Sequence, residues 1–238
     1  MIATMAGAAI SIVDVSHGYG ELPVLAGVSL EVPAGGRLAV IGPSGCGKST
    51  LLSLVAGLEQ PRAGRIAVGG EEPAGERLAR CALMPQDDLL LPWRSALDNA
   101  ALPLVNAGVS RRDARDAARP LFARFGLAGF EDTPPRRLSG GMRQRVAFLR
   151  TLLAGKGVLL LDEPFASLDA LTREELQAWL VDALDQEPRS AIMVTHDVDE
   201  ALRTCPRVAV LSGRPGHVVL AAASADLTRD DVLEALRS

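Results

Sequence analysis

The chain has 238 residues, of which 48% are hydrophobic, and carries a formal net charge of −4 at pH 7. This length suits one compact domain, or one domain that carries an inserted subdomain, and the apolar fraction is large enough for a sizeable core. The acidic balance excludes a general attraction to nucleic acid or anionic lipid, so we expect no nucleic-acid partner.

The three cysteines, Cys46, Cys81 and Cys205, are far apart and form no CxxC pair, which indicates a reduced, cytosolic protein. Residues 1–10 lack the basic region and the long apolar run of a signal peptide. No stretch of the sequence is long enough to span a bilayer. If the protein serves a membrane process, another subunit must therefore cross the membrane.

The first part of the chain is rich in strand and turn signals. An apolar strand over residues 36–42 leads into a glycine-rich loop, and a helix is predicted over 48–58, with Gly57 near its end. Further strands are predicted where β-branched or apolar residues lie between Gly and Pro, at 8–15, 28–32, 65–70 and 81–85.

The middle of the chain has a different composition. From about Ser95 to Gly155 it is rich in Ala, Leu and Arg at helical spacing. The pattern is broken at Pro103, Gly108, Gly126 and the Pro134–Pro135 pair. This predicts an inserted helical subdomain over residues 89–155, within a single domain over 1–238 whose core comprises 1–88 and 156–238.

The last part returns to apolar strands that alternate with helices. Strands are predicted at 158–164, 190–195 and 208–211, and helices at 172–185 and 227–237. Fully apolar strands are typical of buried parallel sheets, and their alternation with helices predicts an α/β fold with a mostly parallel sheet covered on both faces.

Residues 42–49, GPSGCGKS, fit the phosphate-binding pattern G-x-x-x-x-G-K-[ST] between a predicted strand and a predicted helix. Glycines let successive backbone N–H groups turn toward phosphate oxygens, and the helix N-terminus adds partial positive charge. Lys48 is expected to reach the β- and γ-phosphates, and the Ser49 hydroxyl to bind Mg²⁺. Cys46 is expected to be a small buried residue. The predicted nucleotide-binding residues of this P-loop are Gly42, Pro43, Ser44, Gly45, Cys46, Gly47, Lys48, Ser49 and Thr50.

Two adjacent carboxylates, Asp162 and Glu163, end the apolar strand VLLLDEP. Neighbouring side chains at a strand end point to different sides. We therefore assign Asp162 to the metal and Glu163 to the attacking water as general base. Without the P-loop, Asp162 and Glu163 could equally be an ordinary acidic turn after a strand.

Ser139, Gly140 and Gly141 precede an amphipathic helical segment. A second exposed helix N-terminus with small residues is able to bind phosphate. Ser followed by Gly is also an ordinary helix N-cap, so the residues alone leave both interpretations open.

The segment LSGGMRQR, residues 138–145, resembles the signature sequence of ABC ATPases, and the other family motifs follow the family's order. Tyr19 lies where the family places an aromatic ring against adenine, and Gln86 matches a glutamine that touches Mg²⁺ and water. His196, in VTHD, matches the histidine that holds the γ-phosphate. ASLD, ending in Asp169, matches the loop that crosses the dimer interface, although the family usually has S-A-L-D there. Without the resemblance, Tyr19 could be an ordinary turn residue, Gln86 an ordinary loop residue and His196 a structural residue.

The resemblance implies a P-loop NTPase core with an N-terminal antiparallel β subdomain and an inserted helical subdomain. It implies a head-to-tail homodimer in which each ATP lies between the P-loop of one copy and Ser139–Gly141 of the other. The implied catalytic residues are Lys48, Gln86, Glu163 and His196, and the implied Mg²⁺ ligands are Ser49, Gln86 and Asp162. In the family, a groove beside the glutamine loop receives a short helix of the membrane permease.

Residues 88–104 and 211–219 resemble importers of nitrate, sulfonate, taurine, bicarbonate and thiamine precursors. Trp93 is either a core aromatic of the helical subdomain or an anchor in the docking groove. In this group the permease and a separate periplasmic or extracellular solute-binding protein recognise the solute. The implied location is peripheral, at the cytoplasmic face of the inner membrane.

Other classes of P-loop protein fit the sequence less well. An ABC exporter subunit remains the nearest alternative. DNA-repair ABC ATPases need coiled-coil or zinc-bearing insertions, which are not present. Translation-associated ABC proteins carry two cassettes, and only one P-loop is found. A small-molecule kinase would need neither residues 138–145 nor residues 166–169.

Overall fold

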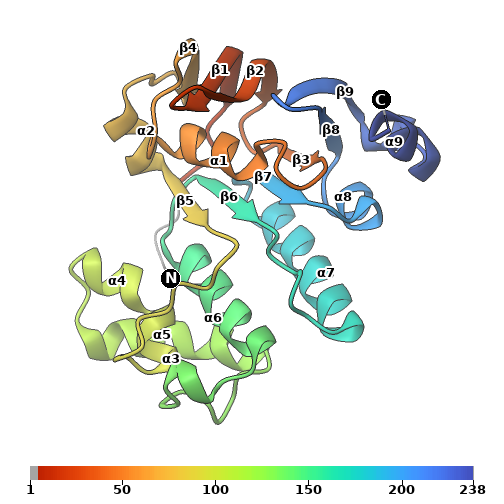
Figure 1. The fold of residues 1–238 in the computed structure, drawn as a ribbon. Helices are drawn as coiled ribbons and strands as arrows, with labels where there is room; N and C mark the ends of the chain where they lie inside the picture. Colours follow the sequence, from red (N-terminus) through yellow and green to blue (C-terminus); the bar gives the residue numbers. More distant parts are fainter. Residues whose placement is uncertain (1–4, 238) are drawn as a thin grey trace.

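The computed structural model describes residues 5–237 and contains two β-sheets with helices around them (Figure 1). We expected residues 1–10 not to form a signal peptide. The first four of these residues lie outside the part of the chain that the structure describes. One sheet has three strands in the order β2-β1-β4, and the other has six in the order β5-β6-β7-β3-β8-β9.

The smaller sheet is antiparallel and confirms the predicted β subdomain. It consists of β1 (Ile10–Tyr19), β2 (Leu22–Val32) and β4 (Ala63–Val68). Ile10 pairs with Val32 and Ile12 with Leu30, and all four side chains are buried. The apolar residues therefore alternate along the strands and place one face of this sheet in the core.

The larger sheet is parallel except at one edge. Its parallel strands are β5 (Cys81–Met84), β6 (Val158–Asp162), β7 (Ser190–Thr195), β3 (Arg37–Ile41) and β8 (Arg207–Ser212). The carboxyl ends of β3, β6 and β7 lie side by side, because these strands are parallel and β7 pairs with both of the others. Loops that follow neighbouring parallel strands form the usual ligand crevice of such sheets.

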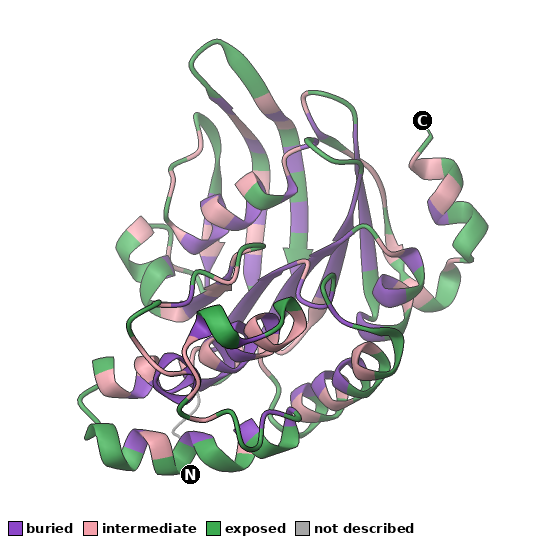
Figure 2. Cartoon of the chain, turned by 60° about the horizontal axis from the view of Figure 1, so that its bottom comes forward, coloured by how far each residue is buried: buried purple, intermediate pink, exposed green. Residues whose placement is uncertain are grey.

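Two core clusters lie on the two faces of this sheet. Val40, Leu160 and Val194 pack with α1 (Lys48–Ala56) and the antiparallel sheet. Their sequence neighbours, among them Ile41, Leu161 and Met193, belong to the other cluster, which reaches the helices of the opposite face. Those helices are α7 (Ala170–Gln186), α8 (Val198–Thr204) and α9 (Arg229–Ala235) together with the helices between β5 and β6. Figure 2 shows the buried strands enclosed by helices with exposed outer faces. The prediction of a sheet covered on both faces is confirmed.

The chain between β5 and β6 is helical, and these helices gather below the sheet in Figure 1. They are α3 (Ala96–Ala100), α4 (Leu102–Asn106), α5 (Arg111–Arg124) and α6 (Gly140–Leu153), with a short 3₁₀ turn at Pro135–Arg137. Gly108 and Gly126 take positive φ values of 91° and 64° where helices end, as expected for helix-terminating glycines. The division into a core and a subdomain over 89–155 stays a prediction.

A strand and a short helix are among the elements that were not predicted from the sequence. Strand β9 (His217–Ala223) adds an antiparallel edge to β8. Its run of three alanines has weak strand propensity, so its pairing with β8 determines its conformation. Helix α2 (Ala74–Arg80) is seven residues long and has too few turns for a periodic signal. It is fixed by the buried Arg77, whose guanidinium donates to the carbonyl of Leu54 on α1.

Candidate functional site

The P-loop leaves the carboxyl end of β3 and turns into α1. Gly47 is the N-cap of α1 with φ 99°, and Gly45 has φ 81°, a region that side chains other than glycine rarely adopt. A Cβ at Gly47 would lie 2.6 Å from the Leu25 side chain. Space and conformation therefore both require glycine at this turn.

Lys48 lies inside this loop. Its side chain is buried, and its ammonium group donates hydrogen bonds to the carbonyl oxygens of Gly42 (2.8 Å) and Pro43 (3.0 Å). Cys46 is fully buried, as expected, and burial raises the pKa of its thiol. Pro43, Ser44 and Gly45 are exposed, so one side of the loop is open to a ligand.

Asp162 ends β6 with a buried side chain next to the P-loop. Burial raises its pKa, and the Glu163 charge adds to this, whereas a hydrogen bond with Ser49 and the Lys48 charge oppose it. The structure thus brings Ser49, Lys48 and Asp162 together. No cluster of three or more His, Cys, Asp or Glu side chains within residues 5–237 could hold a metal ion. A Mg²⁺ ion that is bound with phosphates needs only one or two carboxylates, and one hydroxyl and one carboxylate fit that requirement.

Glu163 and His196 face each other across the ends of β6 and β7. The Glu163 Oε1 atom lies 3.4 Å from His196 Nδ1, and the two side chains are 18% and 68% exposed. Glu163 has a positive φ of 47°, which is a strained conformation for a residue with a side chain. Hydrogen bonds hold it there, because its N–H donates to the Val194 carbonyl at 2.9 Å and its carbonyl accepts from Gln144 at 3.4 Å.

Ser139 is the N-cap of α6, and its hydroxyl accepts from the Met142 N–H at 3.2 Å. Ser139 and Gly140 are exposed, and a Cβ at Gly141 would lie 3.1 Å from the Ser167 carbonyl. The signature segment therefore lies beside the loop that ends in Asp169, which is itself exposed and caps α7. No hydrogen bond or ion pair joins Ser139–Gly141 to the P-loop of the same chain within residues 5–237. Gln86 is exposed after β5.

Tyr19 ends β1 close to α1, and its ring is held by residues that sequence patterns did not single out. Its hydroxyl donates to Glu59 Oε1 at 2.9 Å, and Glu59 Oε2 lies 3.2 Å from His17 Nε2. The rings of His17 and Tyr19 pack edge to face at 5.2 Å. Burial and the Glu59 carboxylate raise the pKa of Tyr19, while a hydrogen bond with Thr50 lowers it. Glu59 is 40 residues from Tyr19, so no local pattern could have indicated this contact.

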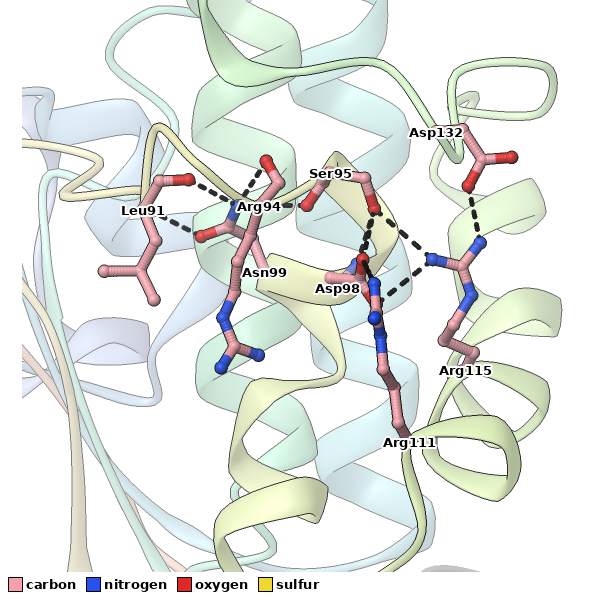
Figure 3. A network of polar contacts seen from close by, with 8 residues as sticks. All are labelled: Leu91, Arg94, Ser95, Asp98, Asn99, Arg111, Arg115 and Asp132. Atoms are coloured by element: carbon pink, nitrogen blue, oxygen red, sulfur yellow. Dashed lines mark hydrogen bonds and ion pairs between the residues drawn. The ribbon is translucent and has the colours of Figure 1, made fainter.

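A second polar site lies in the helical region, where a cavity of about 660 Å³ opens beside Trp93. Trp93 is 77% exposed, so its interpretation as a core aromatic is wrong. The buried carboxylate of Asp98 lines the cavity. It accepts hydrogen bonds from Arg111 at 3.0 and 2.6 Å and pairs with Arg115 at 3.1 Å (Figure 3). Arg115 also binds Asp132 at 2.6 Å.

A glycine-rich loop between a strand and a helix, with a carboxylate at the carboxyl end of another parallel strand of the same sheet, defines a P-loop nucleoside triphosphatase. The family model described as ABC transporter matches residues 25–166, which include both the P-loop and the signature segment. The chain belongs to the ABC transporter family, and it is an ATP-binding, ATP-hydrolysing subunit.

Individual relatives agree with this assignment. The formylaminopyrimidine import ATP-binding protein ThiZ of Halalkalibacterium halodurans is 43% identical, over 86% of this chain and 80% of its own length. The taurine import ATP-binding protein TauB of Burkholderia pseudomallei is 44% identical, over 84% of this chain and 76% of its own length.

Among solved structures, a dimeric post-hydrolysis state of the ATP-binding cassette MJ0796 with ADP and phosphate superposes with a TM-score of 0.81 at 26% identity. That match covers 90% of this chain and 98% of the cassette. Among residues 5–237, no helix has the length and apolar character needed to cross a bilayer.

Proposed function

We propose that this chain is the ATPase subunit of an ABC importer and that it works as a head-to-tail homodimer. The proposal rests above all on the gathering of Lys48, Ser49 and Asp162 with the Glu163–His196 pair at one edge of the sheet. The P-loop, the metal-binding carboxylate and the general base of a phosphoryl-transfer site must meet in this way.

In the proposed site, the backbone of Gly42–Gly47 surrounds the phosphates of ATP, and Lys48 exchanges its two carbonyl partners for phosphate oxygens. Ser49 and Asp162, with Gln86, would hold Mg²⁺, which would neutralise charge on the phosphate oxygens. The buried Asp162 is suited to this role, since a cation would offset the burial that raises its pKa.

Glu163 acts as general base in this proposal and accepts a proton from the attacking water. Its partly buried carboxylate is oriented by the strained backbone and by His196, which lies 3.4 Å away. His196 is 68% exposed, so a second face of the imidazole is available to the γ-phosphate. Tyr19, half exposed beside α1, provides the surface for the adenine ring.

Ser139, Gly140 and Gly141 complete the site from a second copy, and Asp169 lies in the loop next to them at the same interface. The exposure of Ser139 and Gly140 supports this, and no hydrogen bond within residues 5–237 joins them to the P-loop of their own chain. The dimeric state of the related cassette supports it as well. Catalysis then depends on closure of the dimer, since neither chain alone surrounds the γ-phosphate.

The permease is proposed to dock on the helical subdomain, residues 89–155, at the cavity beside the exposed Trp93. A large exposed aromatic next to a hollow with buried polar groups is typical of an interface anchor. The subunit would lie peripherally at the cytoplasmic face of the membrane, and a solute-binding protein would act through the permease. Taurine and formylaminopyrimidine, the solutes in the names of the relatives, indicate a small solute of the sulfonate, nitrate or thiamine-precursor group.

The variant Glu163→Gln tests the shared site. It should bind ATP, lose turnover and elute as a dimer in gel filtration with ATP, because hydrolysis no longer opens the interface. Glu31→Gln, at an exposed position of β2, is the matched control and should behave as the unmodified protein. A Glu163→Gln protein that binds ATP but elutes only as a monomer would contradict the shared-site mechanism.

A further inference from the structure

The turn between β8 and β9, residues 213–216, packs against the outer side of the P-loop. Two backbone hydrogen bonds fix the turn to β2, from Gly216 N–H to the Val24 carbonyl (2.8 Å) and from Ala26 N–H to the Gly216 carbonyl (3.0 Å). A Cβ at Gly216 would overlap the carbonyl oxygen of Cys46. The turn and the P-loop are therefore in backbone contact, and neither can shift without the other.

Arg214 extends from this turn over the centre of the P-loop. Its Nη2 atom donates a hydrogen bond to the carbonyl oxygen of Ser44 at 2.8 Å. A Cβ at Gly45 would lie 2.6 Å from Nη2, 3.1 Å from Cζ and 3.4 Å from Nε of Arg214. These three distances show that the guanidinium group covers Gly45 as well as binding Ser44.

The charge of Arg214 is not neutralised by a carboxylate. It takes part in none of the ion pairs found within residues 5–237, although the chain has an excess of acidic residues. Lys48, the other cation of the loop, lies close to the carboxylate of Asp162. Arg214 is thus a cation beside the phosphate loop whose charge remains available to an anion.

The hydrogen bond to Ser44 also affects the opposite side of the peptide. In a planar trans peptide the C=O and N–H bonds point in opposite directions, so the Gly45 N–H points away from Arg214. A cation on the carbonyl polarises the peptide and makes its N–H a better donor. The hydrogen bond from Arg214 to Ser44 therefore orients the Gly45 N–H and makes it a stronger donor, on the side of the loop that faces away from the turn.

We propose that Arg214 is a positioning residue of the phosphate site, which holds the Ser44–Gly45 peptide in its phosphate-binding orientation and adds positive charge behind it. The ligand class is a nucleoside di- or triphosphate, and the inference rests on the proposed role of the P-loop. Arg214 is expected to strengthen binding of the phosphates of the ligand and to leave binding of its base and sugar unchanged.

Titration calorimetry of the full chain with ATP, ADP and adenosine tests this role in Arg214→Ala, Arg214→Lys and Arg214→Gln. Charge-assisted hydrogen bonds have a net value that corresponds to about tenfold in affinity. We expect Arg214→Ala to bind ATP and ADP about 5- to 20-fold more weakly, with adenosine changed less than about twofold. Arg214→Lys, which keeps the charge, should recover part of the loss. The salt dependence of ATP binding should be shallower in Arg214→Gln than in the unmodified chain.

Arg207→Ala is the matched control, since Arg207 is an exposed arginine at the other end of β8. Lys48→Ala separates the inference from the function on which it depends. If Lys48→Ala loses ATP binding while Arg214→Ala binds ATP and ADP like Arg207→Ala, the role of Arg214 is refuted and the proposed site stands. If Lys48→Ala binds ATP normally, the proposed site itself fails. An equal loss of affinity for ATP and for adenosine in Arg214→Ala would also refute the role, because it would indicate a general disruption of the nucleotide site.

Discussion

Replacement of Asp98 by alanine should destabilise the protein through the network below the Trp93 cavity. The Asp98 carboxylate is 5% exposed and is bound by Arg111, Arg115 and the Ser95 hydroxyl. Removing one partner of a buried ion pair leaves the others with an uncompensated charge, which costs about 3–5 kcal/mol. The loss should lie at or just below the lower limit of this range, because Arg111 is 71% exposed and can be hydrated, and Arg115 keeps its bond to Asp132.

We therefore expect the free energy of unfolding to fall by about 2–3 kcal/mol in Asp98→Ala. For a chain of this size, each kcal/mol shifts the melting temperature by about 2–4 °C, so a drop of about 4–12 °C should be measurable. Asp116→Ala is the matched control, since Asp116 is 60% exposed and forms only an i,i+3 pair with Arg119 at 3.9 Å. Its effect should stay within about 0.5 kcal/mol.

The pH dependence gives a second measurement of the same network. Hydrogen bonds from Arg111, Ser95 and Arg115 hold the pKa of Asp98 well below its ordinary value, although burial opposes them. A depressed carboxyl pKa stabilises the folded state above the unfolded pKa of about 3.9, and that stability is lost as the pH falls below it. The difference in stability between the unmodified chain and Asp98→Ala should therefore be constant from pH 7 to pH 5 and shrink in more acidic solution.

Urea unfolding at several pH values, followed by far-ultraviolet circular dichroism, tests both statements. The reasoning is refuted if Asp98→Ala is as stable as Asp116→Ala at pH 7. It is refuted equally if the difference in unfolding free energy grows as the pH falls from 5 to 3.

Two further predictions concern the nucleotide site. Ser139→Arg should leave ATP binding to one chain within about twofold and abolish hydrolysis, because the serine is proposed to act on the phosphates of the partner copy. Each of the variants Ser139→Arg and Lys48→Ala should be inactive alone, but an equal mixture should regain ATPase activity. In a mixed dimer, the intact P-loop of the Ser139→Arg chain meets the intact Ser139 of the Lys48→Ala chain. No recovery of activity would contradict the proposal that Ser139 acts on the partner copy. Glu59→Ala should weaken ATP binding by about 3- to 10-fold but leave tripolyphosphate binding unchanged, because Glu59 orients the Tyr19 ring. If Glu59→Ala still weakens ATP binding in a Tyr19→Ala background, Glu59 does not act through that ring.

The gathering of the P-loop with Asp162, Glu163 and His196 could be predicted from the sequence. Each of these follows an apolar strand, and the carboxyl ends of neighbouring parallel strands meet at one edge of a sheet. The local conformation that the motifs require was also predictable, since Gly45 and Gly47 take the positive φ values that only glycine adopts readily. These features depend on local backbone chemistry and on the parallel arrangement of the strands, whereas the order of the strands in the sheet was not predicted.

The contacts around the proposed ligand-binding residues could not be predicted in this way. Glu59 reaches Tyr19 across 40 residues and Arg214 reaches Ser44 across 170 residues. Neither contact follows from periodicity, since Tyr19 meets the segment between α1 and β4, and the P-loop meets the turn between β8 and β9. The exposure of Trp93 also depends on how α3 packs against α6, which the composition of the segment does not show.

A segment with a weak structural signal in the sequence makes long-range contacts with the P-loop. Residues 213–223 contain a turn with Gly and Pro and an alanine-rich strand, so local propensity assigns them no definite structure. In the folded chain β9 pairs with β8, and the turn before it contacts Cys46 and Ser44 of the P-loop. The backbone hydrogen bonds that fix this turn to β2 are made by Gly216 and not by Arg214, so the fold does not require an arginine at position 214. Its position over Gly45 is better explained by the negative charge of the ligand that the P-loop binds.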